Sequence, residues 1–115
     1  MRLDVEGRLA GLGLELPQAP SPAANHVPFT VAKGLLFIAG QAPVRGGQYA
    51  CTGRVGAEVT VEAAQAAARL CGLNILAQVK AALGDAGKHA RSALGVAALR
   101  GNVPVVVDAI FELAD

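Results

Sequence analysis

Few side chains in this sequence have types and neighbours that could do chemistry. His26 could exchange a proton near neutral pH, but it stands in a proline-rich stretch, where an exposed histidine is the simpler interpretation. Cys51 and Cys71 form no C-x-x-C motif and have no histidine at ligand spacing, so neither a metal site nor a redox pair is expected. Arg91 begins an expected strand and Asp108 stands on the last one. Taken alone, both are solvated or capping charges near strand ends.

The charge balance argues against a nucleic-acid partner. The chain has ten basic and nine acidic residues, a net charge of +1, and only three phenylalanines and one tyrosine as aromatic residues. Nucleic-acid binders usually show a basic stripe or an aromatic stacking platform, and this sequence shows neither strongly. We therefore do not favour RNA as the natural substrate.

The composition favours one small domain with an apolar surface to cover. The chain has 115 residues, of which 53% are hydrophobic and 17% charged, whereas about 25% charged residues is typical. A homo-oligomer interface would use such a surplus. No run of 18 uncharged apolar residues suggests a membrane span. Residues 1–10 carry four charges and do not resemble a signal peptide, so we expect a cytoplasmic protein with no membrane partner.

Helical and strand patterns supply the elements that must position these residues. The first part is expected to be a helix within residues 1–16, followed by an extended connector over 17–28 that contains four prolines. A long helix is expected to start after Thr60 as N-cap and to end before Gly84 as C-cap. Residues 29–113 would form the core of a single domain.

Strand signals flank the long helix on both sides. Gly34 predicts a hairpin, and the all-apolar run 35–39 predicts a strand that is buried on both faces. Residues 100–102 make a turn between the last two strands. The expected strands cover residues 29–31, 35–39, 91–99 and 103–113, with a short one at 48–51.

Eight short segments follow one another along the chain in a characteristic order and spacing. They are Leu12-Gly13-Leu14-Glu15-Leu16-Pro17, Pro28-Phe29, Leu35-Leu36-Phe37, Gly40-Gln41-Ala42-Pro43, Gly53-Arg54-Val55-Gly56, Ala66-Ala67-Ala68-Arg69-Leu70-Cys71, His89-Ala90-Arg91-Ser92-Ala93 and Val107-Asp108-Ala109-Ile110. Together they resemble the RidA/YjgF superfamily, also called the endoribonuclease L-PSP family, in its subgroup with an added N-terminal helix. The likeness runs from about residue 9 to residue 113.

The resemblance implies a chorismate-mutase-like α/β (α+β) fold, with a mixed sheet packed on a long helix. It also implies a homotrimer with clefts between neighbouring subunits, and no cofactor. The best-known members hydrolyse reactive enamines and imines such as 2-aminoacrylate, and some were reported to cut RNA. In the matching positions, Arg91 would hold a substrate carboxylate through two parallel donors, and the Ala93 carbonyl would orient a water.

The sequence departs from the family pattern at its site positions. Val106 stands where active members carry a glutamate that activates water, and valine cannot relay a proton. Asp108, two positions on, would point to the same face and is a conceivable substitute. Ala39 replaces the serine before the Gly-Gln pair, His26 or a close neighbour replaces a tyrosine, and Ala93 replaces a cysteine.

A larger departure is a gap between Asp85 and Ala86, where the family continues for a few dozen residues. One strand, one helix and an active-site asparagine of the family fold are therefore expected to be missing here. Such a loss exposes sheet edges and apolar surface.

Three functions remain open at this point. The chain is a hydrolytic enamine/imine deaminase or a degenerate relative of one. Alternatively, it is a non-catalytic binder of small carboxylates or ketoacids, or an endoribonuclease.

Overall fold

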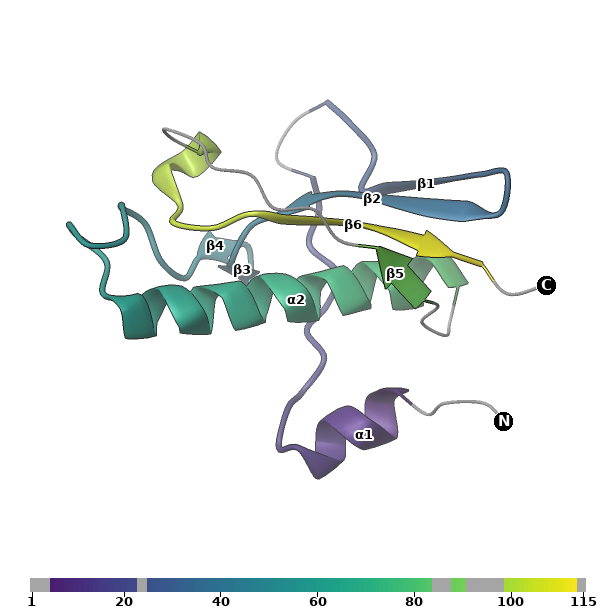
Figure 1. Ribbon diagram of the computed structural model, residues 1–115, viewed down its shortest axis with the longest axis horizontal. Helices are drawn as coiled ribbons and strands as arrows, with labels where there is room; N and C mark the ends of the chain where they lie inside the picture. The colour runs from purple at the N-terminus through teal and green to yellow at the C-terminus, as the bar shows by residue number, and fades with distance from the viewer. Residues whose placement is uncertain (1–4, 23–24, 84–87, 91–98, 114–115) are drawn as a thin grey trace.

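A four-stranded sheet packs with one face on a long helix (Figure 1). This computed structural model describes residues 5–22, 25–83, 88–90 and 99–113. The sheet order is β1-β2-β6-β5, and β3 and β4 form a separate ribbon. The elements are α1 (Val5–Gly11), β1 (Phe29–Ala32), β2 (Leu35–Gln41), β3 (Val44–Arg45), β4 (Gln48–Tyr49), α2 (Val61–Leu83), β5 (Lys88–Ala90), a 3₁₀ turn (Arg100–Asn102) and β6 (Val107–Glu112). The predicted class, a sheet packed on a long helix, is confirmed; the named strands that the structure describes pair antiparallel, where a mixed sheet was predicted.

The β1–β2 hairpin turns where the sequence predicted. Lys33 and Gly34 have φ values of 51° and 74°, which suit a two-residue turn of the primed type that matches strand twist. The register pairs Ala32 with Leu35 and Phe29 with Ile38. This turn therefore fixes which side chains of β2 face the helix.

The core lies between this sheet and α2. Leu36 and Ile38 alternate with exposed neighbours along β2, so both point toward the helix. They pack with Phe111 of β6 against Ile75 and Val79 of α2. Burial of these five side chains holds the sheet on the helix.

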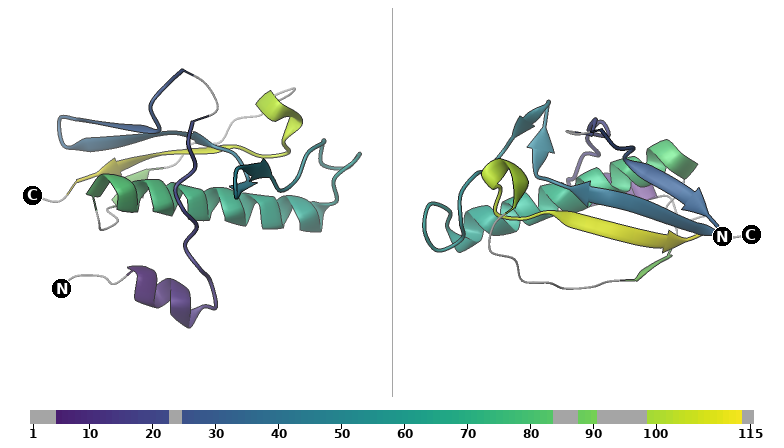
Figure 2. Two further views of the ribbon diagram at one scale, coloured as in Figure 1. Left: turned by 180° about the vertical axis from the view of Figure 1, so that it is seen from behind. Right: turned by 90° about the horizontal axis from the view of Figure 1, so that it is seen from above.

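No helix or strand of the described chain covers the outer face of the sheet. Figure 2 (right) looks down on β1, β2 and β6, with α2 beneath them. Phe37 and Ile110 lie opposite each other in the β2–β6 register and are 39% and 43% exposed. The prediction that residues 35–39 are buried on both faces is therefore wrong for the single chain, because only the helix side is covered.

The long helix starts at its predicted cap. The Thr60 hydroxyl oxygen accepts a hydrogen bond from the Ala63 amide at 3.1 Å, which satisfies one of the free donors of the first turn. The predicted C-cap, Gly84, lies outside the described residues. Among the helices that the structure describes, none is long and apolar enough to cross a membrane.

The chain after α2 differs from the expected strand plan. Residues 84–87 alone separate α2 from β5, so this connection is short, as the predicted gap requires. The expected strand 91–99 lies outside the described residues except for Leu99. The last strand was predicted from residue 103 but begins at Val107, and Pro104, which has no backbone donor, lies in the irregular segment before it.

The N-terminal helix lies on the far side of α2 from the sheet (Figures 1 and 2). Glu6 of α1 forms an ion pair with Lys80 of α2, and Leu9 is buried. After α1, the proline-rich connector crosses α2 and leads to β1. This path brings the connector to the place where β2 ends.

Candidate functional site

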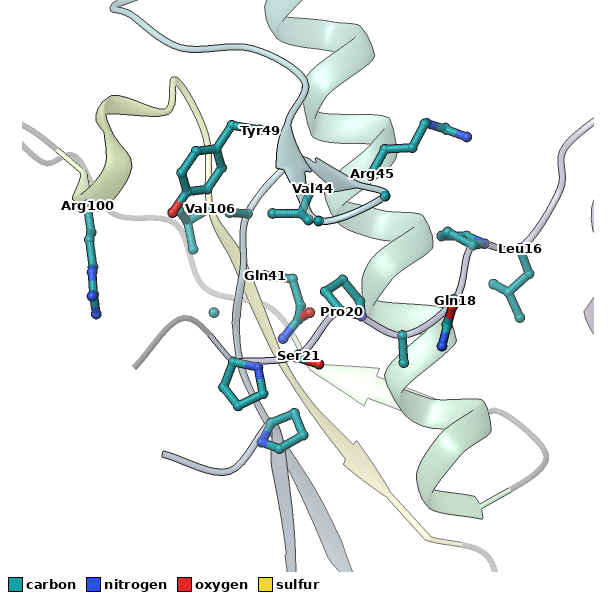
Figure 3. Close-up of a pocket in the computed structure, with 18 of the residues that line it drawn as sticks. Leu16, Gln18, Pro20, Ser21, Gln41, Val44, Arg45, Tyr49, Arg100 and Val106 are labelled. Carbon is teal, nitrogen blue, oxygen red and sulfur yellow. The ribbon is translucent and has the colours of Figure 1, made fainter. Parts of the chain in front are cut away.

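A cavity of about 860 Å³ lies where the connector meets the end of β2 (Figure 3). In the structure the connector begins directly after α1, and its residues 15–22 form one wall. The other walls come from the end of β2, the β3–β4 ribbon and the segment before β6. Ligand pockets usually enclose roughly 300–1,000 Å³, so the size suits a small organic molecule. The lining mixes proline rings with amides and two arginines, Arg45 and Arg100.

A bulge in β2 shapes the floor of the cavity. The β2–β6 register shifts between Ile38 and Gln41, and such an irregularity bends a strand and re-aims its side chains. Gln41 is almost fully buried, and its Nε2 donates to the Ala39 carbonyl at 2.9 Å. The amide of Gln41 is therefore fixed beside the cavity rather than free to rotate.

Two buried amides on α2 hold the cavity walls in place. Gln78 Nε2 donates to the Pro20 carbonyl at 2.8 Å and to Gln41 Oε1 at 3.3 Å. One turn earlier, Asn74 Nδ2 donates to the carbonyl oxygens of Ala42 and Val44, each at 3.0 Å. Buried polar groups need such partners, because an unmade hydrogen bond costs about 1–3 kcal/mol. The helix thus fastens the connector and the β2–β3 corner together.

Tyr49 forms the wall nearest the 3₁₀ turn. A Cβ added to Gly101 would lie 2.7 Å from the Tyr49 hydroxyl oxygen and from Cζ. The ring therefore rests on the backbone of Gly101, which only glycine permits. Tyr49 also lines the cavity, as does Val106, and both are labelled in Figure 3.

The structure brings some of the predicted site residues together. His26 is exposed and lines the cavity, as does Val106, which stands at the position of the family's glutamate; Gly40, which was not predicted as a site residue, lines it too. Ala39 is half-buried just outside the lining and contributes the carbonyl that Gln41 binds. Asp108 is exposed on β6 and is not among the lining residues. The predicted carboxylate site, Arg91 and Ala93, lies outside the described residues.

Sequence reasoning did not single out Tyr49, Arg45, Arg100 or the connector as parts of a site. A partial signal exists, since Arg45 and Tyr49 flank the glycine turn of the β3–β4 ribbon and Arg100 precedes a second glycine turn. Only the folding of the chain brings these two turns to the same cavity, and the local sequence does not indicate it.

Cys71 packs as a small hydrophobic residue in the core. Burial raises the pKa of the Cys71 thiol to about 12, and its S–H donates to the Val105 carbonyl at 3.7 Å. Cys51 is half-buried, and both thiols are free. Within the ranges that the structure describes, no three His, Cys, Asp or Glu side chains gather to hold a metal ion.

Comparison with known proteins identifies the fold family. Residues 6–106 match the family model described as "YjgF/chorismate mutase-like, putative endoribonuclease". The protein called "Protein TCP17" from Trypanosoma cruzi is 33% identical over 150 aligned positions, which cover 95% of this chain and 94% of the relative. Those 150 positions exceed the 115 residues of this chain by 35, so the relative carries residues with no counterpart here.

Two solved structures are similar in both sequence and fold. The first is the protein Atu1372 of unknown function from Agrobacterium tumefaciens, which is 37% identical with a TM-score of 0.80; the match covers 95% of this chain and 92% of that one. The second is described as a "putative endoribonuclease" from Shewanella oneidensis and is 39% identical with a TM-score of 0.66. That match covers 70% of this chain and 53% of that one. The chain therefore belongs to the YjgF/chorismate mutase-like (RidA) family.

Proposed function

We propose that the cavity is the substrate site of a RidA-like deaminase that hydrolyses small 2-imino and 2-enamino acids to 2-ketoacids and ammonia. The supporting observation is that His26, Gly40, Gln41 and Val106 line one cavity, although they come from three separate parts of the chain. The family resemblance assigns the positions of His26 and Val106 to the site, and Gly40 and Gln41 directly follow a third such position, Ala39.

The lining suits an organic acid. Arg45 and Arg100 lie on opposite sides of the group in Figure 3, and with Glu15 as the lining acid they leave this part of the surface with an excess of positive charge, which favours an anion. Arg91, which by resemblance would hold the carboxylate through two parallel hydrogen bonds, remains a prediction. Amides such as that of Gln41 can fix the orientation of the planar C=N group.

The proposed reaction consumes one water molecule. An enamine first takes a proton on its terminal carbon and loses one from its nitrogen, which gives the imine. Water then adds across the C=N bond, with its oxygen on carbon and one of its protons on nitrogen, and forms a carbinolamine. The remaining hydroxyl proton passes to the nitrogen as the C–N bond breaks, which releases ammonia and leaves a 2-ketoacid. His26 is the lining side chain whose type can accept and return a proton near neutral pH.

Val106 favours a second candidate, a binder that does not catalyse. Its side chain occupies the position where the active members of the family have a glutamate, and an isopropyl group cannot activate water. A cavity with this lining would still hold a ketoacid. The chain would then act as a carboxylate-binding protein.

Ammonia release from freshly generated 2-aminoacrylate separates these functions. A deaminase releases ammonia above the buffer rate, and Arg91→Ala slows it. Val106→Glu, which restores a carboxylate, is expected to raise the rate by about tenfold or more, and Val106→Gln is the matched control without a base. No ammonia above buffer, but heat with ketoacids in calorimetry, identifies the binder. If neither ammonia nor heat is detected, both candidates are refuted. RNA cleavage that persists through purification would support the nuclease in the family's description.

We further propose that the chain forms a homotrimer through the outer face of its sheet. The exposed Phe37 and Ile110 lie on that face, and Val106, which lines the cavity, directly precedes β6. A neighbouring subunit seated there would bury apolar surface and border the cavity, as expected for a cleft between subunits.

A further inference from the structure

The N-terminal connector is built into the ligand cavity rather than lying loosely across the helix. Residues 15–22 form a continuous wall of it. In Figure 3, Pro20 and Ser21 lie beside Gln41 at the centre of the group. The residues that would bind a ligand thus face the connector directly.

A single amide joins the connector to the rest of the site. Gln78 is 1% exposed, and its Nε2 donates to both the Pro20 carbonyl and Gln41 Oε1. Gln41 in turn donates to the Ala39 carbonyl in the β2 bulge. The position of the connector and the position of the Gln41 amide therefore depend on the same side chain.

The start of the connector, next to α1, also has an attachment outside the cavity. α1, which precedes it, is joined to α2 by the exposed Glu6–Lys80 ion pair, and Leu9 of α1 is buried. Prolines stiffen the segment between α1 and Pro20, because each ring fixes one backbone angle. The wall is thus stiff, and the Gln78–Pro20 hydrogen bond is its attachment inside the fold.

The wall presents apolar side chains, with the polar Glu15, Gln18 and Ser21 among them, and the space behind it is large. Leu16, Pro17, Pro20 and Pro22 line it from the connector, and Val44 lines it from the opposite side. About 860 Å³ is near the upper end of the usual range for ligand pockets. A molecule as small as 2-aminoacrylate would leave most of this space to water, whereas a bulkier apolar side chain would contact the proline rings.

We propose that the connector, held by Gln78, selects the substrate by the size of its side chain and favours 2-ketoacids and imines with bulky apolar side chains over pyruvate-like ones. This inference rests on the proposed function of the cavity. Gln78 acts through Pro20 and Gln41, so it is a positioning residue.

Calorimetry with pyruvate, phenylpyruvate and the ketoacid of leucine tests the selection. The wild type is expected to bind the two bulky ketoacids about tenfold more tightly than pyruvate, since each buried methylene adds to affinity. Gln78→Met keeps the size of the side chain but removes both donors. It should lower that preference to roughly threefold or less, because the bulky acids lose the wall that they contact and pyruvate does not. Gln65→Met, the same change at an exposed position of α2, should alter nothing.

Limited proteolysis within residues 15–22 supplies the independent readout, since loss of the Gln78 hydrogen bonds frees the segment and should speed cleavage there and not in β2. If Gln78→Met does not fold, Pro17→Gly takes its place, because glycine loosens the same segment without orphaning a buried amide. An unchanged preference despite faster cleavage would overturn the connector's role and leave the proposed function standing. An equal loss of affinity for all three acids, or no preference in the wild type, would overturn it as well. Absence of any ketoacid binding to the wild type would overturn both proposals.

Discussion

The side chain of Val106 lies directly against the Cα of Gly40. A Cβ added to Gly40 would come 2.8 Å from Val106 Cγ1, closer than real carbon atoms approach. The contact lies at the β2 bulge and borders the cavity. The glycine of the Gly40-Gln41 pair is therefore required by its neighbour on the segment before β6, in addition to any role in binding.

Replacing this glycine should destabilise the chain through one identified clash. Gly40→Ala is expected to lower the free energy of unfolding by about 1–3 kcal/mol, because the rigid valine must shift. Urea denaturation measures the loss. The double variant Gly40→Ala/Val106→Ala should recover most of it, as a double-mutant cycle between contacting residues requires. If the double variant shows the full sum of the two single losses, the contact is not the cause.

The Tyr49–Gly101 contact gives a second prediction with a close internal control. Gly101 and Gly34 share a φ of 74°, but a Cβ on Gly34 would meet nothing within 4 Å, whereas one on Gly101 would strike the Tyr49 ring. Gly34→Ala should therefore lower the free energy of unfolding by the backbone strain alone, about 1 kcal/mol. Gly101→Ala should lower it by a further 1–3 kcal/mol or so, because the ring must move.

The Tyr49→Ala background distinguishes the ring from other causes. There the two glycine substitutions should cost the same within about 0.5 kcal/mol, measured by thermal or urea unfolding. If Gly101→Ala still lowers the free energy of unfolding more than Gly34→Ala does in this background, the extra loss comes from a neighbour of Gly101 other than Tyr49. Since Tyr49 lines the cavity, Gly101→Ala should also weaken ketoacid binding, which Gly34→Ala should leave unchanged.

Elements with local signals could be predicted from the sequence. The hairpin at Gly34 and the Thr60 cap were predicted because one or two residues determine each of them, and both are confirmed. Val106 and Asp108 were expected on one face of the last strand. Only Val106 lines the cavity, because β6 begins after it and Asp108 lies further along the exposed face.

The cavity walls depend on contacts between distant residues, which no local pattern encodes. Gln78 and Pro20 are 58 positions apart, and Asn74 and Ala42 are 32 apart. Asn74 and Gln78 stand one turn apart within the most buried part of α2, and two amides at that spacing were the available clue. Periodicity alone could not tell which loops would accept their hydrogen bonds.

The buried Cys71 thiol predicts a loss of stability in alkali. Burial raises its pKa from 9.0 to about 12, so the folded chain keeps the proton while the unfolded chain loses it. Stability from this group is therefore complete below pH 9 and falls as the pH rises toward 12, by up to about 1.4 kcal/mol per pH unit. Urea unfolding of wild type and Cys71→Ala from about pH 8 to about pH 11 measures the difference in slope. Parallel slopes for the two proteins would show that the thiol titrates alike in both states.

The open face of the sheet predicts how the chain assembles. Phe37 and Ile110 face each other there and are more than a third exposed, and a trimer would bury them. Light scattering of the wild type is expected to give three times the 11.6 kDa chain mass. Ile110→Lys should yield a monomer, because a lysine in a packed apolar interface would bury an unpaired charge.

Val61→Lys is the matched control for this test. Val61 is more exposed than Ile110, at 57%, but stands at the start of α2, away from the sheet's outer face. Val61→Lys should therefore leave the trimer intact. Its comparison with Ile110→Lys separates the effect of the sheet's outer face from that of an added charge. A wild-type monomer would contradict the assembly directly. The cavity bordered by Val106 would then have to bind its ligand within one chain, with the connector as its main wall.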